Sequence, residues 1–248
     1  IPWMASKTKA QSLAERHIGP SLSIDQESVI APVRLMRPKL GRREVTPQRT
    51  LGETREPRVS EPMAKGTAPA ATAEAEPADE PLLLSYAQQR QWFLWQWAPQ
   101  STAYNIPVVL RLKGRLDAAA LQRSFQALIE RHESLRTVFT QQDDQPVQVV
   151  LETGSFALAV DELTLAAGES LQTRLHACIE QETAKLFDLQ EGPLMRARLL
   201  RLAADDHVLV VTLHHIISDA WSMQVMVEEL VQFYAGFSAG RDVHLAEL

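Results

Sequence analysis

Cysteine is almost absent from this sequence, since Cys178 is the one cysteine among 248 residues. A single thiol excludes an internal disulfide, and reduced thiols are typical of the cytoplasm, so we expect a cytoplasmic protein. Cys178 falls on an apolar helical stripe, which favours a small core residue over a nucleophile. No apolar run is long enough to span a bilayer, and the opening residues IPWMASKTKAQ lack the hydrophobic core of a signal peptide, so we expect no membrane partner. Because the chain begins with Ile, the sequence also suggests an incomplete piece of a longer protein.

Aromatic residues are almost absent from the first third of the chain. Residues 1–80 contain one aromatic, Trp3, but nine of the fourteen prolines, with 12 basic and 11 acidic side chains. This composition offers too little apolar surface to offset the entropy of ordering the chain, which predicts a disordered or linker segment over residues 1–80. The basic cluster RPKLGRR at 37–43 has no interleaved aromatics and is followed at once by acids, so we interpret it as solvated linker and expect no nucleic-acid partner.

Residues 81–248 have the composition of a globular domain and carry the other fourteen aromatics. Apolar periodicity and capping residues predict four helices, which start at Ser85, start at Asp117, cover roughly 169–186, and run from Ser218 or Asp219 to near Gly240. The predicted strands are 108–113, a hairpin of SLRTVFT and PVQVVLE, 156–163, 195–202 and 207–215.

The order of these elements predicts an α+β fold in which a mostly antiparallel sheet packs against helices. The segment HVLVVTLHH (207–215) is apolar on both faces, so we expect it to be a central strand. Strict βαβ alternation and a glycine-rich phosphate loop are both missing, which disfavours a dinucleotide-binding fold.

The stretch LHHIISDAWS (213–222) concentrates the chemistry-bearing side chains. The two-residue period of a strand places His214 and His215 on opposite faces, so they cannot perform the same task. Asp219 lies where the strand turns into a helix and can cap that helix or orient a neighbour. Two interpretations stay open from the residues alone: buried core histidines beside a capping aspartate, or an imidazole that takes a proton from an attacking nucleophile.

Other kinds of site are less well supported by spacing. A zinc site needs a third ligand, and neither His176 nor His207 has a suitable spacing. Ser222 lies inside a predicted helix without a nucleophile elbow, and Cys178 has no neighbouring histidine in any motif. Chemistry at this stretch would therefore pass through His215 without a protein nucleophile.

Four motifs together resemble the opening motifs of nonribosomal peptide synthetase condensation domains. They are SYAQQRQWFL (85–94), RHESLRTVF (131–139), FDLQEGPLMRARLL (187–200) and LHHIISDAWS (213–222), in the order and approximate spacing of that family. The resemblance implies a chloramphenicol acetyltransferase-like lobe. It identifies residues 81–248 as the N-terminal lobe of a condensation domain, truncated before the second lobe and preceded by a disordered linker.

In that family an amine on the acceptor phosphopantetheine arm attacks the thioester on the donor arm and forms an amide. The resemblance implies that His215 faces the tunnel and deprotonates or orients the amine, while His214 supports it. Asp219 would be structural and paired to an arginine, for which Arg136 is a candidate.

The resemblance also implies which cofactors and partners to expect. No cofactor or metal is expected to bind directly, because phosphopantetheine would arrive on peptidyl or acyl carrier protein partners. An adenylation domain of the same synthetase is a further expected partner. The motif residues expected to support the fold alone are Arg90, Trp92, Arg131 and His132.

Two departures from the family keep other functions open. Ala220 stands where the family usually has glycine beside the substrate amine, and the second lobe that closes the tunnel is missing. We therefore expect the fragment alone to be inactive. The alternatives are another HHxxxD acyltransferase that uses a coenzyme A thioester, an epimerisation domain, and a non-catalytic remnant or docking module.

Overall fold

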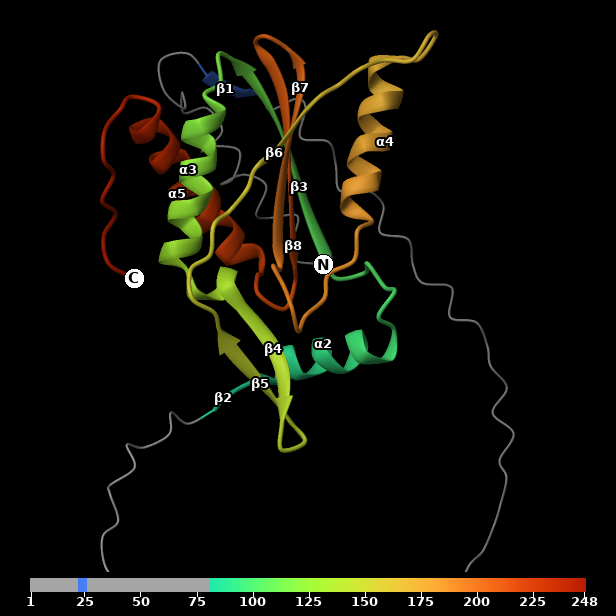
Figure 1. The fold of residues 1–248 in the computed structure, drawn as a ribbon, viewed down its shortest axis with the longest axis vertical. Coiled ribbons are helices and arrows are strands. Elements are labelled where there is room, and N and C mark those ends of the chain that lie inside the picture. Colours follow the sequence, from blue (N-terminus) through green and yellow to red (C-terminus); the bar gives the residue numbers. More distant parts are fainter. Residues whose placement is uncertain (1–21, 26–80) are drawn as a thin grey trace, which may run out of the picture. The chain divides into compact units, whose positions relative to one another are not determined.

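A five-stranded sheet forms the centre of the fold (Figure 1). The computed structural model describes residues 22–25 and 81–248, and the strand order of this sheet is β1-β3-β8-β7-β6. The strands are β1 (Leu22–Asp25), β3 (Asn105–Gly114), β6 (Ala159–Glu162), β7 (Met195–Ala203) and β8 (Asp206–His214). Neighbouring strands are antiparallel except β6 and β7, which are parallel. The expected α+β class is therefore confirmed, and β8 is the central strand that its apolar sequence predicted.

The chain divides into two units, Ile1–Arg37 with Leu82–Leu248 and Pro38–Pro81, and every element described below belongs to the first unit. The prediction of a linker over residues 1–80 is wrong at β1, which pairs antiparallel with β3 from Leu22 opposite Gly114. Four residues are too short to show a period, and their backbone groups are satisfied by the free edge of β3. The remainder of that predicted linker lies outside the described residues.

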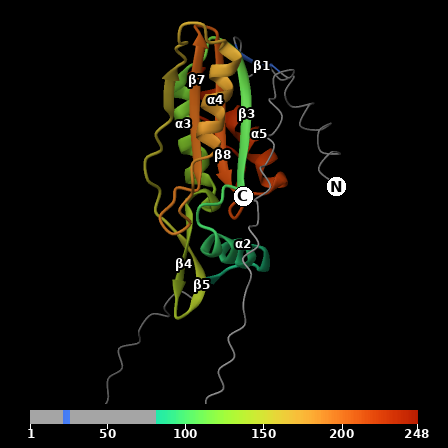
Figure 2. The same cartoon turned by 90° about the vertical axis from the view of Figure 1, so that its right-hand side faces the viewer.

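Helices cover both faces of the sheet (Figures 1 and 2). On one face lie α3 (Ala118–Arg131) and α5 (Ala220–Phe237), which also pack on each other. On the other face lies α4 (Leu171–Thr183), whose Cys178 and Ile179 are buried against the sheet. Cys178 is thus a core residue, as its helical stripe predicted.

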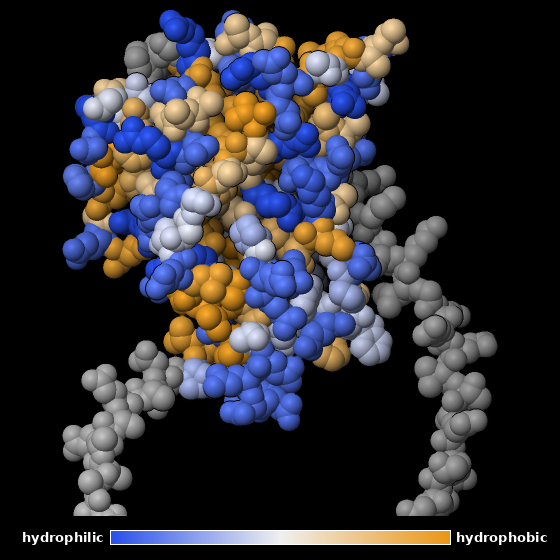
Figure 3. Space-filling model, viewed as in Figure 1, coloured by the Kyte–Doolittle hydropathy of each residue, from blue (hydrophilic) through white to orange (hydrophobic). Residues whose placement is uncertain are grey.

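A second, smaller sheet with order β2-β5-β4 lies with α2 near one end of the large sheet (Figure 1). Its elements are β2 (Leu82–Leu83), α2 (Tyr86–Trp97), the 3-10 turn η3 (Glu133–Arg136), β4 (Thr137–Gln142) and β5 (Gln145–Val150). The β4–β5 turn holds Asp143 and Asp144 at φ 48° and 62°, the left-handed geometry that tight hairpins require and that aspartate tolerates. Apolar residues gather over this part of the molecule in Figure 3, and Leu82, Leu83, Val149 and Leu151 are exposed there.

Several predicted boundaries differ from the observed ones by a few residues. The helix expected over 169–186 is Leu171–Thr183, and the strand expected over 156–163 shortens to Ala159–Glu162. The first residues of SLRTVFT form η3 instead of strand. The starts of α2 and α3 were predicted correctly, because Ser85 forms a capping box with Gln88 and Asp117 caps α3.

Candidate functional site

The candidate site is the loop between β8 and α5, which contains His215 and Asp219 and follows His214, the last residue of β8. Backbone hydrogen bonds hold the entry to this loop: the N–H of His214 donates to the Leu194 carbonyl (3.0 Å) and that of His215 to the Tyr104 carbonyl (2.9 Å). Ile216 is buried in the main core, so the loop is anchored by an apolar side chain as well.

His214 is enclosed and only 4% exposed. Its Nδ1 accepts the backbone N–H of Ile216 at 3.1 Å, which places the proton of the neutral ring on Nε2. The Phe187 ring meets it edge-on at 6.0 Å between centroids. Burial, and to a lesser extent the neighbouring His215, lowers the pKa of His214 to about 4, so this imidazole is uncharged at neutral pH.

His215 is exposed, in contrast to its neighbour. Its Nδ1 lies 2.6 Å from the backbone carbonyl oxygen of Ser218. A carbonyl oxygen can only accept, so in the neutral ring Nδ1 carries the proton and Nε2 keeps its lone pair. The loop therefore holds His215 as an imidazole with a basic Nε2, the arrangement that a general base requires.

Asp219 is the N-cap of α5. Its side chain accepts the backbone N–H of Ser222 at 2.8 Å, and the Ser222 hydroxyl accepts the N–H of Asp219 at 2.8 Å. The Ser222 N–H, as the largest cause, lowers the pKa of Asp219 below its usual value. Both bonds close a capping box that begins the helix immediately after the histidine loop.

The expected pairing of Asp219 with Arg136 is wrong. The Arg136 guanidinium donates instead to the Leu151 carbonyl at 2.6 Å and to the Glu133 carboxylate at 3.2 Å. Arg136 ends η3 and enters β4, so its nearest acceptors are those of the small sheet, whereas the charge of Asp219 is satisfied by the start of α5.

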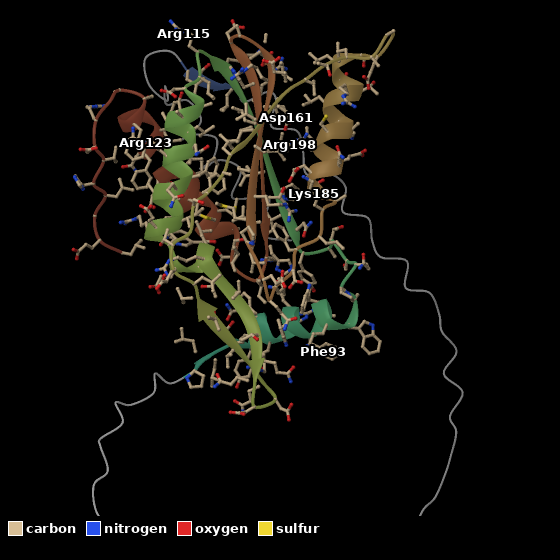
Figure 4. The ribbon with its side chains drawn as sticks, in the orientation of Figure 1. Phe93, Arg115, Arg123, Asp161, Lys185 and Arg198 are labelled. Carbon is tan, nitrogen blue, oxygen red and sulfur yellow. The ribbon has the colours of Figure 1, made fainter. Side chains whose placement is uncertain are left out.

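Helix α4 holds a buried carboxylate that sequence reasoning missed. Glu182 is 3% exposed and lies 2.5 Å from Lys185, 3.4 Å from Arg196 and 3.7 Å from Arg198. Arg198 also pairs with Asp161 at 2.7 Å, and the two side chains lie together in Figure 4. A run of charges on one helix and one strand predicts a solvated face, and only the tertiary fold shows that this carboxylate is enclosed.

The motif RHESLRTVF supports the fold, as expected. Arg131 and His132 both contact the Glu229 carboxylate of α5, at 3.2 Å and 2.6 Å, and so join α3 to α5. Trp92 is buried in the core, whereas Arg90 is exposed. The Tyr104 carbonyl, which holds the N–H of His215, was missed because a backbone acceptor leaves no signal in sequence.

The described residues show no candidate metal site and no membrane-spanning helix. Within 22–25 and 81–248, no three His, Cys, Asp or Glu side chains are grouped so as to hold a metal ion. In the same part of the chain, no helix has the length and apolarity needed to cross a membrane.

The described lobe carries the residues of an HHxxxD motif, His214, His215 and Asp219, at the end of β8 and in the loop after it. Comparison with known proteins identifies the family to which the lobe belongs. The family model of the condensation domain matches residues 79–248, and the chain belongs to that family. One polypeptide of linear gramicidin synthase from Brevibacillus parabrevis is 46% identical over 69% of this chain, and nonribosomal peptide synthetase kk1B of Curvularia clavata is 40% identical over 65%. The chain spans 2% and 1% of the lengths of these two proteins.

Two solved structures have the same fold. The X-domain from teicoplanin biosynthesis matches with a TM-score of 0.62 and 31% identity, over 72% of this chain and 37% of that one. The starter condensation domain of rhizomide synthetase matches with a TM-score of 0.62 and 24% identity, over 68% of this chain and 40% of that one. The described lobe thus corresponds to well under half of each solved domain.

Proposed function

We propose that residues 81–248 form the N-terminal lobe of a condensation domain in a nonribosomal peptide synthetase, and that His215 handles the proton during amide formation. The observation that carries this proposal is the hydrogen bond from Nδ1 of His215 to the Ser218 carbonyl, at 2.6 Å. It leaves Nε2 of an exposed ring as an acceptor. The family match over residues 79–248 supports the same reaction class.

The proposed reaction joins two acyl groups carried as thioesters on phosphopantetheine arms. The amine nitrogen of the acceptor attacks the donor thioester carbonyl, so a C–N bond forms and the C–S bond breaks. Nε2 of His215 takes the proton that the amine loses and can return it to the departing thiolate. Proton and leaving group are then both accounted for, and no metal or nucleotide is needed for this step.

The partners in this proposal are carrier proteins that deliver the phosphopantetheine arms, together with an adenylation domain of the same synthetase. Because the His215 side chain is exposed, water reaches it freely in the described lobe. A thioester at such a site would compete with hydrolysis unless a second lobe excluded solvent. We accordingly expect no amide formation by the 248-residue chain alone.

The test uses the protein extended past Leu248 by a second condensation-domain lobe, supplied with donor and acceptor aminoacyl carrier proteins. Mass spectrometry of the carrier arms would detect the amide product. We expect His215→Ala to reduce product formation by roughly 10²- to 10⁴-fold, the usual contribution of a general base. The matched control is His176→Ala, an exposed histidine on α4. Unchanged activity in His215→Ala would refute the role of His215.

A non-catalytic docking module is the second candidate function. It is favoured by the likeness to the teicoplanin X-domain, which has been solved in a complex with OxyB. Ala220 in place of the usual glycine points the same way. If the extended wild-type protein formed no amide with any carrier pair, while a partner protein bound it stably, this function would replace the first.

A further inference from the structure

We propose that Gln91 and Gln88 of α2 are positioning residues for His215, an inference that rests on the proposed function. Their side-chain amides donate to two successive carbonyls of the loop: Gln91 Nε2 to the His215 carbonyl and Gln88 Nε2 to the Ile216 carbonyl, each at 3.4 Å. The same His215 residue donates its N–H to the Tyr104 carbonyl. The peptide groups before and after the His215 side chain are thus hydrogen-bonded to residues outside the loop.

Orientation of these peptides decides the tautomer of the ring. Nδ1 of His215 bonds to the carbonyl of Ser218, three residues along, so the ring and the loop backbone close one hydrogen-bonded turn. Rotation of the His215 or Ile216 peptide would move the Ser218 carbonyl relative to Nδ1. Donors that hold these two carbonyls therefore keep Nδ1 protonated and Nε2 basic.

Gln88 is fixed before it reaches the loop. Its Oε1 accepts the N–H of Ser85 at 2.9 Å, which starts α2, and its Nε2 also donates to Gln148 of β5 at 3.0 Å. Gln148 in turn donates to the Leu83 carbonyl of β2 at 3.0 Å. One glutamine thus begins the helix, joins it to the small sheet and directs a donor at the Ile216 carbonyl.

Gln91 differs from Gln88 in that its side-chain oxygen has no partner among the described residues, so it tests the positioning role more sharply. Its Oε1 is buried and finds no donor among the residues that the structure describes. An unsatisfied buried amide oxygen is unfavourable for stability, so a leucine of similar size would suit this position better in a purely structural helix. We infer that glutamine stands here for its bond to the His215 carbonyl, since helix packing gives no reason for it.

The rest of α2 supplies a matched control. Gln89 lies on the same helix, but its Nε2 donates to the Leu84 carbonyl at 3.0 Å, and within residues 81–248 its side chain makes no hydrogen bond to the histidine loop. Phe93 lies on the side of α2 turned away from the five-stranded sheet (Figure 4). Gln89→Leu therefore makes the same chemical change as Gln91→Leu without touching the loop.

The experiment measures the ring protonation of His215 in the 248-residue chain by long-range ¹H–¹⁵N correlation at neutral pH, for wild type, Gln91→Leu, Gln88→Leu and Gln89→Leu. We expect the Nδ1–H form to dominate in wild type and Gln89→Leu, and to be replaced by a mixture of tautomers in the other two. Thermal unfolding is measured in parallel. Gln91→Leu should be as stable as wild type or more so, which a merely structural role for Gln91 would not produce.

In the extended protein, the two loop-contacting variants should lower the amide-forming kcat roughly tenfold to a hundredfold, with the acceptor KM little changed. Gln89→Leu should retain the wild-type kcat. Unaltered His215 tautomers in both Gln91→Leu and Gln88→Leu would overturn this inference and leave the proposed function standing. Absence of amide formation in wild type would overturn the proposed function instead, while the tautomer measurement would still judge the positioning role.

Discussion

The two histidines at the end of β8 differ more than their adjacent positions suggest. His214 is enclosed beside Phe187, and its pKa is lowered to about 4. His215 is exposed, and its ring is held by the Ser218 carbonyl. One peptide bond thus separates a buried, neutral packing residue from an exposed histidine whose ring is oriented by a backbone carbonyl. On the buried side, substitutions should change stability, and on the exposed side they should change chemistry.

The largest effect should come from the buried side, through Glu182. Removing its carboxylate in Glu182→Ala leaves the partly buried Arg196 without its charge partner, and Arg196 stacks on Phe187 at 3.7 Å. We expect the free energy of unfolding to fall by about 3–5 kcal/mol, the usual result of removing one partner of a buried ion pair. Urea denaturation would measure the change. Glu180→Ala, at a half-exposed pair on the same helix, should cost less than about 0.5 kcal/mol.

The next effect is a pH dependence of stability that belongs to His214. Its pKa lies at about 4 in the fold and near 6.5 when unfolded, so the unfolded state binds more protons between these values. Stability is therefore full above pH 6.5 and should fall by on the order of 3 kcal/mol as the pH drops from 6.5 to 4.

The variant His214→Asn should remove most of this slope in chemical denaturation curves recorded at each pH. Asparagine keeps an acceptor for the Ile216 N–H but does not titrate. A share of the slope should remain, because burial also lowers the pKa of His207. If the free energy of unfolding of His214→Asn fell with pH as steeply as that of wild type, His214 would not titrate as the fold implies.

A smaller effect is expected at Asp219, which is exposed. Asp219→Ala removes the N-cap of α5 and should lower the free energy of unfolding by about 1 kcal/mol. Asp219→Asn keeps the cap and removes the charge, so it should be nearly as stable as wild type. If Asn were as costly as Ala, the charge of Asp219 would be engaged beyond the cap.

A still smaller effect than that of Asp219→Ala should follow from Ala220→Gly. Ala220 is the first residue of α5 and is exposed, and positive φ angles among the described non-glycine residues occur only at Asp143 and Asp144. Glycine therefore relieves no strain there. We expect it to lower the free energy of unfolding by about 0.5 kcal/mol, because its unfolded chain has more freedom to lose. Increased stability would indicate that the methyl group strains the helix start.

Local signals account for what the sequence predicted well. The capping box at Ser85 and the apolar run of β8 depend on residues close together in the sequence, so the sequence predicts them. The same holds for the opposite environments of His214 and His215. Arg136 shows the limit: many carboxylates and carbonyls compete for a guanidinium, and the fold decides which one is near.

The missed features all depend on distant segments. β1 was missed because four residues carry no period, and its pairing requires the edge of β3. The enclosure of Glu182 required α4 to pack beside β7, and the acceptor at Tyr104 is a backbone group that any residue would supply. Such features follow from the assembled sheet and cannot be derived from spacing along the chain.

The loop after β8 holds the His215 ring with the proton on Nδ1 and the buried His214 ring neutral. Ring ¹H–¹⁵N spectra of the wild-type chain, recorded from pH 8 to pH 4, test it most directly. We expect His215 to be protonated on Nδ1 with a bare Nε2 at high pH, and His214 to be protonated on Nε2 and uncharged down to about pH 4. A His215 ring protonated on Nε2, or a His214 ring that becomes charged near pH 6.5, would contradict it.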